Sequence, residues 1–157
     1  MNPVILPATR WDVAHLAAVM RPSDIDECAF LAKMTGRFDD NFSIHRDLET
    51  AFKNTEIYSM WRGDRLLACG GVAPTPRDNA GAIWLLGTDA ADEFPISLTK
   101  GAMQFVRAER KKWRWMGNIV PRHFEKRIKW LKHLGFDTDE KNPQKLKNGY
   151  VTFWSLS

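Results

Sequence analysis

The chain has 157 residues, 44% of them hydrophobic and 27% charged, which is the composition of an ordinary globular domain. No apolar run reaches the roughly 18 to 20 residues that cross a bilayer, and the first residues, MNPVILPATRWD, lack the basic segment and long apolar core of a secretory signal. We therefore expect one domain over residues 1–157, with no membrane span and no secretion by a signal peptide.

The formal net charge of +4 is unevenly distributed. Residues 1–106 carry 10 Lys and Arg against 14 Asp and Glu, whereas residues 107–133 carry 10 against 2. Such a basic region either meets a polyanion, such as nucleic acid or the phosphates of a nucleotide cofactor, or forms a solvated helix face. Trp113, Trp115 and Trp130 interleave with these charges as in single-stranded nucleic-acid platforms. However, WRWMGNIV alternates as a strand does, so we assign part of this set to the core and do not expect nucleic-acid binding.

The cysteines and histidines show no metal-type spacing. Cys28 and Cys69 sit among apolar neighbours, which favours two small buried side chains in a reducing compartment over a disulfide. The four histidines are scattered along the chain, so we expect no metal site.

The first third of the chain predicts one strand followed by three helices. Residues 4–6 are an apolar run ended by Pro7, and Thr9 is placed to cap a helix. A second helix begins at Pro22, with acids in its first turn, and ends at Gly36. A third follows DDNFS, because its apolar residues recur at helical spacing: Ile44, Leu48, Ala51 and Phe52.

The rest of the chain predicts three antiparallel strands and then alternating helices and strands. EIYSMW and RLLACGGVA flank the turn RGD, a hairpin signal, and AGAIWLLGTD supplies the third strand. A helix follows Pro95, WRWMGNIV is a short strand, and Pro121 is predicted to open the helix RHFEKRIKWLKHLG. Gly135 would end that helix with a left-handed conformation, and FDTDE and YVTFWSLS would be the last strands.

This order of elements, together with the helix ending in LGF, resembles the GNAT superfamily of acetyl-coenzyme A (acetyl-CoA) dependent N-acetyltransferases. More narrowly, MRPSDIDECA, WLLGTD and NIVPRHFEKRIKWLKHLGF are similar to GNAT-like proteins of tailed bacteriophages, including the internal virion protein A type of short-tailed phages. The resemblance implies an α/β (α+β) fold, with a mixed, mostly antiparallel sheet, helices on both faces, and splayed fourth and fifth strands. It also implies the host cytoplasm or the phage virion as the location.

For a cofactor, the resemblance implies acetyl-CoA between strand four, at residues 82–88, and strand five, at residues 114–120. A splayed strand exposes backbone groups that pair with pantetheine, and amides at a helix N-terminus hold pyrophosphate. The residues placed at the cofactor are Leu86, Gly87, Thr88, Thr99, Lys100 and Asn118. An alternative role for Asn118 is to bond exposed backbone at the end of its strand.

For catalysis, the same resemblance places Glu27, Asp89 and His123 near the cleft, as candidates to take a proton from an amine on a small molecule or a protein. Each has a simpler interpretation. Glu27 falls in the expected first turn of a helix, where carboxylates are stabilised by the helix dipole. Asp89 is placed to cap the turn after its strand, and His123 to face solvent.

Two features depart from the family pattern. The usual glycine-containing phosphate loop is replaced by GTDAADEFPISLTKG, whose Asp89, Asp92 and Glu93 would repel pyrophosphate. Leu131 stands where family members often place the tyrosine that protonates the leaving thiolate. The alternative function is therefore a non-enzymatic virion or host-interacting protein that keeps the fold without the cofactor loop.

Overall fold

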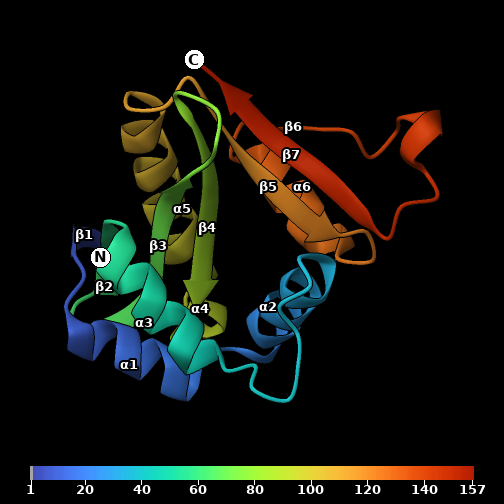
Figure 1. Cartoon of the computed structure of the whole chain (residues 1–157). Helices are drawn as coiled ribbons and strands as arrows, with labels where there is room; N and C mark the ends of the chain where they lie inside the picture. Colours follow the sequence, from blue (N-terminus) through green and yellow to red (C-terminus); the bar gives the residue numbers. More distant parts are fainter. Residues whose placement is uncertain (1) are drawn as a thin grey trace.

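The computed structural model describes residues 2–157 as a seven-stranded sheet with helices on both faces (Figure 1). The strand order is β1-β2-β3-β4-β5-β7-β6, and among the strands of residues 2–157 only β4 and β5 are parallel. The strands are β1 Val4–Pro7, β2 Ile57–Arg62, β3 Arg65–Pro74, β4 Ala80–Gly87, β5 Trp115–Pro121, β6 Asp137–Thr138 and β7 Tyr150–Leu156. The mixed, mostly antiparallel sheet predicted from the sequence is confirmed.

The helices also follow the predicted order. They are α1 Arg10–Val19, α2 Pro22–Met34, α3 Ile44–Asn54, α4 Asp89–Glu93, α5 Pro95–Arg110 and α6 Glu125–His133, with a 3-10 turn at Pro143–Lys145. Local signals set several boundaries. The Thr9 hydroxyl accepts from the Asp12 N–H at 3.2 Å and the Asp12 carboxylate accepts from the Thr9 N–H at 2.9 Å, which is a capping box. Gly135 has φ +99°, as predicted for the residue that ends α6.

The structure differs from the prediction at α6, at the sixth strand and at α4. Helix α6 begins at Glu125 rather than at Pro121, because Pro121 is still paired with Tyr150 and the Arg122 N–H continues the strand by donating to Gly149 O at 2.9 Å. The sixth strand contains two residues only. The short helix α4 was not predicted, and it occupies the segment expected to be a loop.

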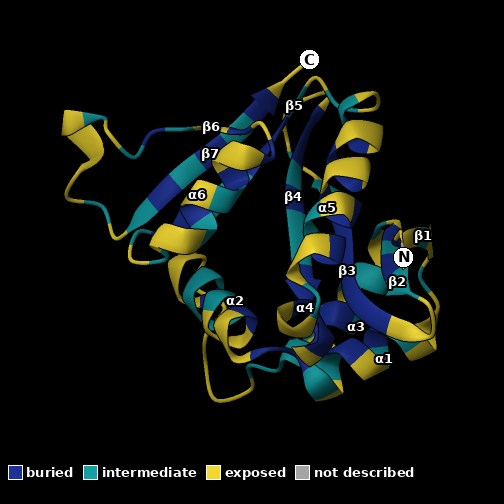
Figure 2. Cartoon of the chain, turned by 180° about the vertical axis from the view of Figure 1, so that it is seen from behind, coloured by how far each residue is buried: buried dark blue, intermediate teal, exposed yellow. Residues whose placement is uncertain are grey.

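Each face of the sheet has its own apolar core. Helices α1 and α3 cover one face, where Val13, Leu16 and Leu48 pack against strand residues including Leu66 and Leu86. Helices α5 and α6 cover the other face, with buried residues that include Ala102, Phe105, Ile128 and Leu131. Figure 2 shows the exposed sides of these helices pointing away from the sheet. Within residues 2–157 no helix is both long and apolar enough to cross a membrane.

The sheet is divided at the parallel pair of β4 and β5. Strands β4 and β5 are in register over three positions, from Ala80 opposite Trp115 to Ala82 opposite Gly117. Beyond these positions the two strands diverge, as Figure 1 shows. Because β3 pairs with β4 over seven positions and β7 with β5 over seven, each half of the sheet is well formed by itself, and the opening lies between the halves.

Candidate functional site

The gap between β4 and β5 is closed at its narrow end by the side chain of Asn118. The amide nitrogen donates to Ile83 O at 3.0 Å, and the amide oxygen accepts from the Ile119 N–H at 2.8 Å. In a continued parallel ladder Ile83 O and the Ile119 N–H would bond each other. The Asn118 amide is therefore inserted into the ladder as a wedge, at the position where the strands separate.

At the wide end, the edge of β4 is occupied by residues from the start of α2. The Gly87 N–H donates to Asp24 Oδ2 at 2.6 Å, and Gly87 O accepts from the Arg21 N–H at 3.0 Å. Alternate residues of a strand direct their backbone groups to the same edge. Between Ile83 and Gly87, the N–H and C=O of Leu85 consequently face the gap.

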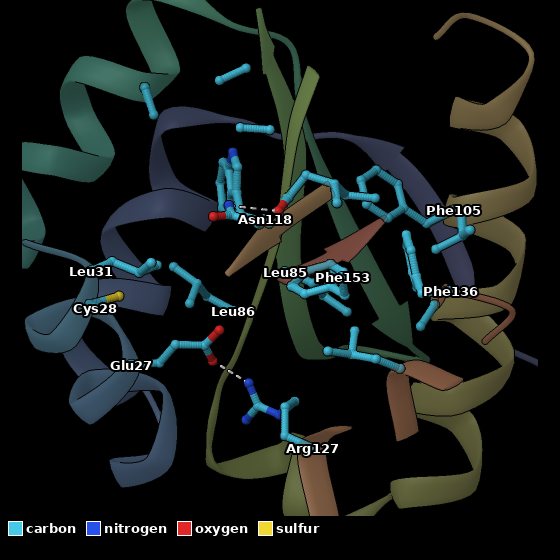
Figure 3. A pocket seen from close by; sticks show the side chains of 18 of the residues that line it. Glu27, Cys28, Leu31, Leu85, Leu86, Phe105, Asn118, Arg127, Phe136 and Phe153 are labelled. Atoms are coloured by element: carbon cyan, nitrogen blue, oxygen red, sulfur yellow. Dashed lines mark hydrogen bonds and ion pairs between the residues drawn. The ribbon is translucent and has the colours of Figure 1, made fainter. Parts of the chain in front are cut away.

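A cavity of about 360 Å³, which we call the inner cavity, passes through the sheet at this gap (Figure 3). Its walls come from both faces of the sheet and are mainly apolar. On the side of α2 and α3 they include Cys28, Leu31, Ile44, Leu48 and Leu86; on the side of α5 and α6 they include Leu85, Phe105, Leu134, Phe136 and Phe153. The carboxylate of Glu27 and the guanidinium of Arg127 lie together at one end of the view in Figure 3.

A buried charge network ties α2 to α6 and α4 across the wide end of the gap. Asp24 is fully buried and accepts from Arg21 Nε at 2.6 Å and from Arg127 Nη2 at 2.7 Å. The other terminal nitrogen of Arg127 donates to Glu27, and Arg21 also reaches Asp92 at 3.1 Å. Two guanidiniums therefore meet two buried carboxylates, which is the pairing that buried charges require.

Glu27 is the ionisable group of the cavity whose pKa is brought close to neutral pH. Burial raises the pKa of Glu27 from 4.5 to about 7, against the opposing effect of Arg127. The neighbouring Cys28 has a thiol pKa raised to about 12, first by burial and then by the charge of Glu27. Glu27 is thus able to exchange a proton near neutral pH, whereas Cys28 stays a thiol.

A second, more open cavity of about 650 Å³ lies outside the charge network, between the first turn of α5 and the start of α6. We call it the outer groove. Its lining includes Pro95, Leu98 and Thr99 from α5, and His123, Lys126 and Trp130 from the other side. Arg127 and Trp130 line both this groove and the inner cavity, so they form the boundary between the two.

The structure distributes the predicted cofactor residues over several environments. Leu86 and Asn118 line the inner cavity, and Thr99 lines the outer groove. The other three residues lie elsewhere: the Gly87 N–H is bonded to Asp24, Thr88 is fully buried with its hydroxyl donating to Leu66 O at 2.6 Å, and Lys100 is exposed outside both cavities.

The predicted catalytic residues are also separated. Glu27 lines the inner cavity, exposed His123 lines the outer groove, and Asp89 is exposed on α4 outside both. Glu27 does not lie in the first turn of α2, because that helix begins at Pro22 and the first-turn acid is Asp24. The interpretation of Glu27 as a helix-dipole partner was therefore wrong.

No sequence pattern predicts the partners that hold Glu27. Asp24 fits the pattern of a first-turn acid, and neither Arg21 nor Arg127 stands in a recognisable motif. Arg127 is 100 residues away from Glu27 in the sequence, so no local pattern connects them. The spacing of Arg21 and Asp24 around Pro22 marks the start of a helix. It does not indicate that these two side chains are buried beside Glu27.

The tryptophans among the basic residues are used by the fold. The indole N–H of Trp113 donates to Glu109 at 3.2 Å, and that of Trp130 donates to Thr99 Oγ1 at 2.9 Å. Both rings are partly buried and pack against the core on the α5 and α6 side. This agrees with the assignment of part of the set to the core.

No family model and no curated protein match this sequence. Solved structures do match its fold over nearly the whole chain. A ribosomal-protein-alanine N-acetyltransferase from Brucella melitensis has a TM-score of 0.66 at 15% identity, covering 98% of this chain and 99% of its own.

Two further structures extend this comparison. The protein yncA from Salmonella typhimurium, solved with its cofactor acetyl-CoA, has a TM-score of 0.69 at 14% identity, covering 99% of this chain and 94% of its own. An acetyltransferase of the GNAT family from Streptococcus pneumoniae has a TM-score of 0.54 at 13% identity, covering 99% of both chains. The fold of this chain is therefore the fold of the GNAT acetyltransferases.

Proposed function

We propose that this protein is an N-acetyltransferase that moves an acetyl group from acetyl-CoA to an amine at the gap between β4 and β5. The observation that carries the proposal is the gap itself. A parallel pair of only three positions opens onto a cavity that holds a carboxylate with a pKa of about 7. The similarity to yncA, which was solved with acetyl-CoA, supports the choice of cofactor.

The edge of β4 fits the pantetheine part of this cofactor. The N–H and C=O of Leu85 face the gap, and an extended chain that carries amide groups can pair with such an edge as an added strand does. When bound, acetyl-CoA supplies an acetyl group activated as a thioester. Leu86 and Asn118, which line the cavity beside Leu85, would hold the thioester end in place.

The phosphates of acetyl-CoA would fit the outer groove less closely than pantetheine fits the edge of β4. Lys126 and His123 supply donors, and the first turn of α5 adds the positive end of a helix dipole. Asp92 and Glu125 line the same groove and oppose a polyanion. We therefore expect weak binding of the cofactor, and we expect that binding to weaken further as salt rises, because exposed charges are screened within about 10 Å at 0.1 M.

Glu27 is the proposed general base. In water at neutral pH an amine is mainly an ammonium ion. It must lose a proton before its nitrogen can attack a carbonyl carbon. With a pKa of about 7, Glu27 is ionised in a useful fraction at neutral pH and lies inside the cavity to accept that proton. Because Leu131 carries no proton donor, the leaving thiolate takes its proton from solvent in this proposal.

The test of the base compares the three candidate residues. Glu27→Gln should lower kcat by about 100-fold, the lower end of what a positioned base contributes. In wild type, kcat/KM should rise with pH up to about pH 7 and then level off, as Glu27 loses its proton. Asp89→Asn and His123→Ala are measured in parallel. Full activity of Glu27→Gln would exclude Glu27 as the base.

The test of the cofactor is titration of acetyl-CoA at two ionic strengths. Lys126→Ala should weaken binding and reduce its dependence on salt. Lys100→Ala, on α5 but outside the groove, is the comparison that decides whether the sequence-based assignment of Lys100 holds. Tight binding that does not respond to salt would contradict the placement of the phosphates, and no binding at millimolar cofactor would contradict the enzyme itself.

The phage-type relationship remains a hypothesis based on three short sequence windows. It would be supported if the gene lay beside phage tail or internal core genes. The alternative of a non-enzymatic virion or host-interacting protein becomes the better explanation if acetyl-CoA does not bind.

A further inference from the structure

The part of the inner cavity beside α2 and α3 has a continuous apolar wall. Six residues from three elements form it: Cys28, Leu31, Ile44, Leu48, Ala51 and Leu86. Cys28 belongs to this apolar set because its thiol stays protonated, with a pKa of about 12. Glu27 precedes Cys28 on α2 and also lines the cavity, so this space has apolar sides and a carboxylate nearby (Figure 3).

The charged side chains and the Asn118 amide of the inner cavity already have partners within the protein. Arg127 is bonded to Asp24 and Glu27, and both ends of the Asn118 amide are bonded to backbone. The remaining pair, Arg37 and Asp47, is joined at 2.9 Å and has half-exposed side chains. A ligand with several hydroxyl or ammonium groups would therefore lose water without gaining new partners, which is costly in an apolar space.

The volume of the cavity limits the size of the ligand. At about 360 Å³ the inner cavity is near the lower end of the roughly 300 to 1,000 Å³ range of ligand pockets. The acetyl thioester would take part of this space. What remains suits a small amine.

We propose that the acceptor is a small primary amine with a single charge and an apolar body, such as an alkylamine or an arylalkylamine. This inference rests on the proposed acetyl transfer. The amine nitrogen lies toward Glu27, and the apolar body lies against α2 and α3. Burial of the body supplies the binding energy, at roughly 0.8 kcal/mol for each methylene removed from water.

The test uses matched amines with the wild-type protein and acetyl-CoA, followed by release of free CoA. Hexylamine and 1,6-diaminohexane have the same carbon chain and differ in one terminal ammonium. We expect kcat/KM for hexylamine to be at least ten times that for the diamine. Phenethylamine should also be a substrate, and a lysine-containing pentapeptide with a free N-terminus should not.

A variant of the cavity wall tests whether the amine binds in the inner cavity. Ala51→Leu adds three carbons to the wall and so narrows the cavity. It should raise the KM for phenethylamine about ten-fold while changing the KM for ethylamine little. Ala108→Leu makes the same substitution at an exposed site on α5 and should change neither value.

The outcomes separate this inference from the function on which it rests. A preference for the diamine or the peptide would overturn the inference and leave acetyl transfer standing. Binding of acetyl-CoA without acetylation of any apolar amine would also overturn the inference. Failure to bind acetyl-CoA would overturn the proposed function, and the inference with it.

Discussion

The two ends of the gap between β4 and β5 are closed by different kinds of interaction. At the narrow end, the neutral amide of Asn118 bonds Ile83 O and the Ile119 N–H, and no charge is involved. At the wide end, the buried carboxylate of Asp24 bonds the Gly87 N–H and two guanidiniums. Both ends satisfy backbone groups that an interrupted sheet leaves unpaired.

The difference has consequences for how each end opens. A neutral hydrogen bond gives about the same stability at every pH, whereas a closure made of charges depends on which carboxylates are ionised. Glu27 connects proton binding with the cavity, because it belongs to the charged network at the wide end and also lines the cavity. The wide end is therefore the end at which proton binding and ligand entry are connected.

The largest effect is expected from removing the charge at the centre of the wide end. Asp24→Asn removes the fully buried partner that Arg21 and Arg127 share, so it should lower the free energy of unfolding by about 3 to 5 kcal/mol in urea titration. Asp92→Asn removes another partner of Arg21, but the side chain of Asp92 is 65% exposed. That control should cost no more than about 1 kcal/mol. Equal effects of the two variants would show that the network is not buried.

A second prediction concerns pH. The pKa of Glu27 is about 7 in the folded state and 4.5 in the unfolded reference, so between these values the folded state binds more protons. The contribution of Glu27 to the free energy of unfolding should therefore fall as pH rises from about 4.5 to about 7, and then level off. Relative to Glu27→Gln, wild type should lose about 3 kcal/mol across this range. A constant difference between the two proteins would contradict the raised pKa.

Disrupting the neutral, narrow end should lower the free energy of unfolding by a smaller amount, and that amount should not depend on pH. Asn118→Ala leaves Ile83 O and the Ile119 N–H without their partner, at a cost of about 1 to 2 kcal/mol in chemical denaturation. The cost should be equal at pH 5 and pH 8. Asn54→Ala, which removes an exposed amide bonded to Thr50 O at 2.9 Å, should have a smaller effect. A strong pH dependence of Asn118→Ala would remove the contrast between the two ends.

The smallest effect is expected at the wall of the inner cavity, where shape matters rather than charge. Gly135 lies between Leu134 and Phe136, which both line the cavity, and has φ +99°. A β-carbon there would also lie 2.7 Å from Arg110 Nη2. Gly135→Val should cost about 1 kcal/mol in thermal unfolding. Gly149→Val is the control, because a β-carbon at Gly149 meets nothing within 4 Å. Unchanged stability of Gly135→Val would refute the strain argument.

The fold was more predictable from the sequence than the site. Capping at Thr9, proline at the start of α2 and glycine at Gly135 act through neighbouring residues, so the sequence carries them directly. The start of α6 was misplaced because a proline that suits a first helical turn also suits the end of a strand. Pairing with β7 decided between the two.

The site depends on contacts between distant parts of the chain. Arg127 meets Asp24 and Glu27 only after α6 and α2 have packed on either side of the gap. Asn118 is the exception among the site residues, because its place on β5 could be assigned and its alternative role, bonding backbone, corresponds to the contacts in the structure.

The three-position pairing of β4 with β5 also bears on cooperativity. Strands β1 to β4 form one continuous antiparallel unit, and β5, β7 and β6 form another. Few backbone hydrogen bonds join them, so separating the units breaks little of the ladder inside either one. We therefore expect amide protons in β2 and β3 to report on a different opening equilibrium from those in β7.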